Sequence, residues 1–139
     1  MTLSEAERAE LIEELASARH GHGLPPEATH RASRRSRTCG DAYEVGLVME
    51  GDRVIRLGWE GHGCVVSTAA ASTLASLAPG RTAEELRDLV ARHLAAVEPG
   101  AEPDPLLGED AALFAGIGRL PLRAGCATIA WRAALDALA

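Results

Sequence analysis

The chain has 139 residues and a formal net charge of −6, and it contains no lysine, asparagine or glutamine. Without lysine it cannot form a Schiff base or build a G-x-x-x-x-G-K phosphate loop, and its acidic balance argues against nucleic acid as the main partner. No apolar stretch approaches the roughly 20 residues of a membrane span, and the length suits a single domain, predicted as residues 1–139.

The N-terminal segment is acidic and helix-forming. Ser4 and Glu7 form an S-x-x-E capping box, which predicts an amphipathic helix over residues 4–19. This is not the pattern of a secretory signal, so we expect a cytoplasmic protein. Its three cysteines are then expected to act as thiols in metal or redox chemistry rather than as a disulfide framework.

The next segment, residues 20–33, carries the glycines and prolines of a loop, and a strand is expected near residues 33–39. A basic run over residues 31–37, with Arg34 and Arg35 at its centre, leads into Cys39 in an otherwise acidic chain. Two interpretations are open: a solvated stretch, or a docking site for an acidic partner beside a reactive cysteine.

Residues 42–60 are predicted to form a β-hairpin. Apolar and polar residues alternate from Tyr43 to Met49, and again from Ile55 through Leu57 to Trp59, around a Gly-Asp turn. The apolar face of this hairpin must be covered by helices.

Helical patterns dominate the rest of the chain. Small residues over 65–78 predict a closely packed central helix, and Thr82 and Glu85 form a second capping box at the start of the next helix. A loop is expected over 97–109, followed by a short helix around 110–116, and Cys126 is expected to open the last helix. The predicted fold is therefore α+β, with a small antiparallel sheet (hairpin 42–60 plus a strand near 33–39) packed against about four to five helices.

The three cysteines fall at junctions between these elements. Cys64 and Cys126 stand at predicted helix N-termini, where free N–H groups and the helix dipole favour a thiolate. Asp41 lies two residues after Cys39 and would point the same way in an extended segment. Three sulfurs and one carboxylate suit Zn²⁺ or a cluster iron, but the spacing contains no C-x-x-C pair and leaves both a metal site and a coincidence open.

Three segments together resemble a known family. Residues 38–41 (TCGD), 61–67 (GHGCVVS) and 123–131 (RAGCATIAW) resemble the three cysteine motifs of the IscU/NifU N-terminal family, in the same order. The chain is similar to the SufU branch of that family, because the interval between Cys64 and Cys126 is long and Gly125 stands where the IscU branch has a histidine. Arg123 matches an arginine of the SufU branch. The L-P-P-V-K motif, with which the IscU branch docks a chaperone, is absent and is replaced by residues 120–123 (LPLR).

The resemblance implies a SufU/IscU-like fold and a function. Proteins of the SufU branch bind Zn²⁺ through residues that correspond to Cys39, Asp41, Cys64 and Cys126. They accept sulfur from a SufS-type cysteine desulfurase and pass it toward iron–sulfur cluster assembly by downstream Suf proteins. Resemblance to the SufU branch makes Cys39 the acceptor that carries the persulfide, with Arg123 near its thiolate, whereas in the IscU branch the last cysteine, here Cys126, more often has that role, so both cysteines stay open as the carrier. Either way the resemblance implies a sulfurtransferase-like protein rather than a stand-alone enzyme.

Two other functions stay open at this point. The same ligands would suit a scaffold that binds iron and assembles a transient 2Fe–2S cluster, or a metal-stabilised partner that regulates a desulfurase without carrying sulfur. His20, His22 and His30 are expected to be solvated loop residues, His62 is not a ligand in the family, and His93 is expected on a helix flank.

Overall fold

The computed structural model describes residues 3–36, 40–120 and 122–139. Within them, strands β1 (His30–Arg35), β2 (Ala42–Glu50) and β3 (Arg53–His62) form an antiparallel sheet in the order β1-β2-β3. The α-helices are α1 (Glu5–Ala18), α2 (Val65–Leu77), α3 (Ala83–Ala96), α4 (Gly108–Ala112) and α5 (Arg123–Leu138), with short 3₁₀ turns at Pro105–Leu107 and Ile117–Arg119. The predicted α+β class is confirmed.

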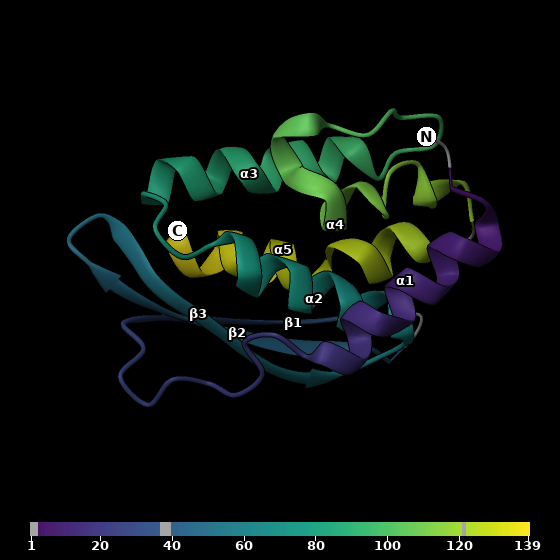
Figure 1. The fold of residues 1–139 in the computed structure, drawn as a ribbon. Coiled ribbons are helices and arrows are strands. Elements are labelled where there is room, and N and C mark those ends of the chain that lie inside the picture. Colours follow the sequence, from purple (N-terminus) through teal and green to yellow (C-terminus); the bar gives the residue numbers. More distant parts are fainter. Residues whose placement is uncertain (1–2, 37–39, 121) are drawn as a thin grey trace.

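The elements are arranged in layers (Figure 1). Helices α2 and α5 pack on one face of the sheet, α3 and α4 lie beyond them, and α1 packs against α2. On the opposite face, the segment between α1 and β1 crosses the strands so closely that a Cβ on Gly58 would lie 2.2 Å from the carbonyl oxygen of Gly23. The sheet is therefore covered on both faces where this segment crosses it.

The capping boxes in the sequence correctly predicted where α1 and α3 begin. The hydroxyls of Ser4 and Thr82 accept hydrogen bonds from the N–H groups of Glu7 and Glu85, and each glutamate returns a bond to the capping residue, as both capping boxes predict. Helix α2 is central, as its small residues predicted, and its close approach to α5 lets the indole N–H of Trp131 donate to the carbonyl of α2 residue Ala70 at 2.9 Å.

A β-bulge changes which side chains of the hairpin are buried. The register between β2 and β3 shifts at Val48 and Met49, so that Met49 pairs with Val54 while Val48 pairs with Arg56. Val54 is therefore fully buried and Ile55 is 48% exposed. The expectation that Ile55 shares the inner face with Leu57 is wrong, because strict alternation does not survive an inserted residue.

Three boundaries also differ from the sequence expectations. Strand β1 begins at His30, inside the predicted loop, and the predicted end of that strand at residues 37–39 lies outside the described residues. The short helix begins at Gly108 rather than near 110. Helix α5 begins at Arg123, so Cys126 is its fourth residue, because Leu122 adopts a left-handed conformation (φ 69°) and turns the chain into the helix earlier.

His93 belongs to the core. Its side chain is fully buried, its Nε2 lies 2.8 Å from the carbonyl oxygen of Ala127, and its ring stacks on Trp131 with centroids 3.8 Å apart. The expectation of a helix-flank position is therefore wrong. Among the described residues, no helix has both the length and the hydrophobicity that crossing a bilayer requires.

Candidate metal site

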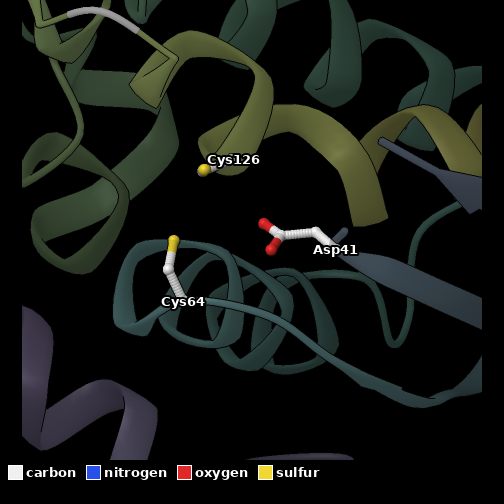
Figure 2. Close-up of side chains that lie close together, drawn as sticks. All are labelled: Asp41, Cys64 and Cys126. Carbon is white, nitrogen blue, oxygen red and sulfur yellow. The ribbon is translucent and has the colours of Figure 1, made fainter. Parts of the chain in front are cut away.

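One carboxylate and two thiols meet where three elements begin. Asp41 directly precedes β2, Cys64 is the N-cap residue of α2, and Cys126 lies in the first turn of α5. Figure 2 shows the three side chains pointing toward one another, and each offers a ligand atom within 4.8 Å of the other two. Residues distant in the sequence thus form a compact group of sulfur and oxygen donors.

Cys39, the fourth predicted ligand, lies outside the described residues. The chain on either side of it is held together, because the N–H of Ser36 donates to the carbonyl of Asp41 at 2.7 Å. The structure therefore brings three of the four predicted ligands together, and a hydrogen bond joins Ser36 to Asp41, the described residues nearest to Cys39 that are paired.

The Asp41 carboxylate is buried in a way that favours a positive partner. Only 3% of Asp41 is exposed, and its Oδ2 has no hydrogen-bond partner within the described part of the chain. Leaving a buried carboxylate oxygen unpaired is costly, and a cation would remove that cost. Two thiols beside such a carboxylate suit Zn²⁺ or iron better than Mg²⁺ or Ca²⁺, which prefer oxygen ligands.

Gly63 allows the carboxylate to lie this close to α2. A Cβ at this position would lie 2.3 Å from Ser67 Oγ and 2.7 Å from Asp41 Cγ, which no real side chain tolerates. The glycine before Cys64 is therefore explained by packing around the site. By contrast, a Cβ on Gly125, next to Cys126, would meet nothing within 4 Å.

Both thiols lie at helix starts, as predicted, but in different ways. Cys64 has extended backbone angles (φ −72°, ψ 172°), and its side chain makes no capping hydrogen bond. Cys126 lies one turn into α5, and its N–H donates to the carbonyl of Leu122 at 3.3 Å. The dipole argument therefore applies directly to Cys64 and more weakly to Cys126.

Behind the thiols lies a hydroxyl network that sequence reasoning missed. The Tyr43 hydroxyl lies 3.0 Å from both Ser67 Oγ and Thr68 Oγ1, and burial raises the pKa of Tyr43, opposed by these two hydrogen bonds. The hydroxyl of Ser67 donates to the carbonyl of Cys64. The sequence offered one indication that Tyr43 lies near the site: it follows Asp41 by two residues and is the only tyrosine in the chain.

The site opens into a surface pocket of about 530 Å³, lined by Gly40, Asp41, His62, Gly63, Cys64, Leu122, Arg123 and Cys126. Arg123, the predicted charged neighbour of the thiols, is half-buried at the first position of α5. Leu122 is 58% exposed at the rim. Of the three donors that line this pocket, Cys64 is partly exposed, whereas Asp41 and Cys126 are buried in its wall.

A family model for the NifU-like N-terminal domain matches residues 7–130. The chain belongs to this family. Its relatives include the iron–sulfur cluster assembly scaffold protein IscU of Streptococcus pyogenes serotype M1, which is 30% identical over 122 residues, covering 86% of this chain and 74% of that protein. Another is the zinc-dependent sulfurtransferase SufU of Bacillus subtilis (strain 168), 33% identical over 98 residues, or 69% of this chain and 65% of that protein.

Solved structures of the family share the fold. SufU of Fervidobacterium islandicum AW-1 superposes with a TM-score of 0.85 at 23% identity, covering 94% of this chain and 95% of that one. A NifU-like N-terminal protein of Brucella abortus gives a TM-score of 0.78 at 26% identity, with coverages of 93% and 90%. The predicted membership and the IscU/SufU-like fold are thus confirmed.

Two arginines of the basic run over residues 31–37 contact other parts of this chain. Arg34 forms a two-pronged pair with Asp136 of α5, at 2.6 and 3.0 Å, which lowers the pKa of that carboxyl. Arg31 donates to the carbonyl of Pro25 at 3.3 Å. Arg35 is exposed beside the outer face of the sheet. Arg34 therefore ties β1 to α5, and Arg35 is the better candidate for an external contact.

The histidines expected in loops have different surroundings, and His30 lies not in a loop but at the first position of β1. The ring of His22 meets the edge of Trp59 with centroids 5.0 Å apart, and His30 Nδ1 lies 2.8 Å from Thr29 Oγ1. The exposed His20 uses its carbonyl to accept the indole N–H of Trp59 at 2.7 Å. His62 borders the pocket but is not part of the close donor group.

Proposed function

We propose that this protein accepts sulfur from a SufS-type cysteine desulfurase and passes it to downstream Suf proteins for iron–sulfur cluster assembly. The observation that carries the proposal is the convergence of Asp41, Cys64 and Cys126 at one open pocket. Relatives that are named as a zinc-dependent sulfurtransferase and as an iron–sulfur assembly scaffold support it.

The residues present fit a zinc ion held by Cys39, Asp41, Cys64 and Cys126. Three of these donors lie close together, and the unpartnered Asp41 oxygen suits a cation. Cys39 is two residues from Asp41, and two residues span at most about 7 Å, so chain connectivity keeps Cys39 within reach. When bound, zinc keeps its thiolate ligands deprotonated and adds its binding free energy to the stability of the fold.

Cys39 is the proposed sulfur acceptor. Its thiolate attacks the terminal sulfur of the desulfurase persulfide, a new S–S bond forms at Cys39, the old S–S bond breaks, and the desulfurase cysteine leaves as a thiolate. One sulfur atom changes carrier without net oxidation, so the step needs no further oxidant or reductant. Arg123 borders the same pocket and would offset the negative charge of the thiolates there.

The test is to trap the persulfide. The protein is mixed with desulfurase and cysteine, alkylated, digested and analysed by mass spectrometry. We expect one added sulfur on Cys39, and we expect Cys39→Ser to lose both the label and the stimulation of desulfurase turnover. Cys126→Ser is the matched control, because it removes a proposed ligand and should lower zinc content while the label on Cys39 persists. A label confined to Cys126 would reject Cys39 as the acceptor.

A second candidate function is an iron–sulfur scaffold, favoured by the name of the Streptococcus pyogenes relative. Purification without oxygen separates the two functions. Stoichiometric zinc in a colourless protein supports sulfur transfer, and a coloured 2Fe–2S protein supports the scaffold. Zinc-loaded protein that stimulates the desulfurase but never carries persulfide would instead indicate a regulatory partner.

These experiments treat residues 1–139 as one domain. Within the described residues, one hydrophobic cluster draws buried side chains from α1, α2, α3, α4 and α5 and from β2 and β3, which supports that choice.

A further inference from the structure

Three hydroxyl groups connect β2 to the start of α2 behind the candidate metal site. The Tyr43 hydroxyl lies 3.0 Å from Ser67 Oγ and 3.0 Å from Thr68 Oγ1. Ser67 Oγ lies 3.0 Å from the carbonyl oxygen of Cys64. We call Tyr43, Ser67 and Thr68 the hydroxyl relay. Its far end is the main chain of a residue that offers a thiol to the site.

Proton counting gives the relay a direction. Each hydroxyl carries one proton to donate, whereas a carbonyl oxygen can only accept. The proton of Ser67 goes to the Cys64 carbonyl, so the Tyr43 proton goes to Ser67 and the Thr68 proton goes to Tyr43. All three protons are used in one head-to-tail chain, in which each bond polarises and strengthens the next.

The relay holds Cys64 by its main chain. The Cys64 carbonyl accepts the Ser67 hydroxyl and also the N–H of Thr68 at 3.0 Å. The Cys64 side chain makes no capping hydrogen bond of its own. The position of its Cβ, and with it the positions that Sγ can reach, is therefore set by how its backbone is fixed, and the relay supplies one of the two bonds to its carbonyl.

The same relay is connected to the carboxylate side of the site. Tyr43 follows Asp41 by two residues, at the start of β2. Asp41 and Ser67 also pack against the same face of Gly63, where a Cβ would lie 2.3 Å from Ser67 Oγ and 2.7 Å from Asp41 Cγ. A shift of Ser67 would therefore change the space available to Asp41 as well as the position of Cys64.

We propose that Tyr43 is a positioning residue for the metal site, which acts through Ser67 to fix Cys64 relative to Asp41 and so raises the affinity for Zn²⁺. The inference rests on the proposed metal site and adds a residue outside the ligand set. Packing does not explain the hydroxyl, since a phenylalanine would fill the same buried space beside Trp59, whose ring centroid is 5.7 Å away.

The experiment compares zinc affinity in matched variants. Metal-free protein is titrated with Zn²⁺ against a chromophoric chelator under reducing conditions, and Co²⁺ absorption reports ligand geometry. Tyr43→Phe should weaken zinc binding roughly tenfold, at the lower end of the range for outer partners of metal ligands, and shift the Co²⁺ bands. Thr73→Val is the control: it also removes a buried hydroxyl from α2, one that donates to Ala69 at 2.9 Å, about 13 Å along the helix from Cys64.

A double-mutant cycle tests the serial arrangement. Because Tyr43 acts through Ser67, Ser67→Ala and the Tyr43→Phe/Ser67→Ala double variant should lose the same affinity. Equal zinc affinity and Co²⁺ spectra in wild type and Tyr43→Phe would overturn the proposed role of Tyr43. So would a double variant whose loss of zinc-binding free energy equals the sum of the losses in the two single variants. If Tyr43→Phe does not fold, Ser67→Ala and Thr68→Val carry the same test. A wild type that binds no zinc would instead reject the metal site.

Discussion

Replacing His93 with phenylalanine should make the fold less sensitive to acid. His93 is fully buried, and its contacts are neutral groups: the Ala127 carbonyl and the rings of Phe114 and Trp131. Its Nδ1 has no hydrogen-bond partner in the described residues. Burial lowers the pKa of His93 to about 4 from an ordinary 6.5, and the hydrogen bond to Ala127 opposes the shift only in part.

The direction of the effect follows from where the proton binds. Between pH 6.5 and 4 the unfolded chain takes up a proton at His93 that the folded protein does not. The free energy of unfolding therefore falls as the pH drops through this window, and the contribution of His93 levels off below it. A shift of 6.5 − 4 = 2.5 units corresponds to roughly 3 kcal/mol, a large part of the ~5–15 kcal/mol that stabilises a domain.

The assay is urea unfolding of metal-free protein at several pH values from 7 to 4.5. Wild type should lose most of this stability across the range, and His93→Phe should lose much less, because phenylalanine keeps the stacking on Trp131 but cannot be protonated. His20→Ala is the matched control, since it removes an exposed imidazole and should keep the wild-type slope. Carboxyl groups titrate in all three proteins, so their effect cancels in the differences. Parallel loss of stability in wild type and His93→Phe would refute the reasoning.

Three further predictions concern the site and the β1 contact. Gly63→Ala should weaken zinc binding at least tenfold and destabilise the fold by about 1–3 kcal/mol, because the added Cβ would lie 2.7 Å from Asp41 Cγ. Gly125→Ala, in contrast, should raise the free energy of unfolding by up to about 1 kcal/mol, because its Cβ would meet nothing within 4 Å. Chelator competition measures the zinc affinity of each variant, and urea unfolding measures its stability. Zinc at a thousandfold excess over its dissociation constant should stabilise wild type by about 4 kcal/mol and Asp41→Ala far less, as read from thermal unfolding. A double-mutant cycle of Arg34→Ala and Asp136→Ala should give a coupling below about 1 kcal/mol that shrinks in 1 M salt, since both partners are more than a third exposed.

Sequence reasoning succeeded where the signal was local. The capping boxes at Ser4 and Thr82 placed the starts of α1 and α3, because a capping box uses only residues of the first turn. It failed where pairing partners decide the outcome. The bulge that buries Val54 instead of Ile55 depends on the register between two strands, which alternation within one strand does not contain.

The candidate site divides in the same way. The cysteine motifs predicted the grouping of Asp41, Cys64 and Cys126 through family resemblance, while spacing alone left it open. The role of Tyr43 was hidden because a tyrosine in an apolar strand face already has an explanation in core packing. Its hydroxyl partners come from a helix 24 and 25 residues away in the chain, and only the packing of β2 against α2 brings them together.

The charge of the proposed ligand set gives a reason for its position at two helix starts. Three thiolates and a carboxylate carry four negative charges and Zn²⁺ removes two, so a loaded site would retain a formal charge of about −2. Helices α2 and α5 both begin at the site, and each N-terminus contributes roughly half a positive charge. Arg123 on the pocket wall adds one more, which brings the sum near zero. In a chain of net charge −6, these local positive charges are what would let four anionic ligands share one partly buried site.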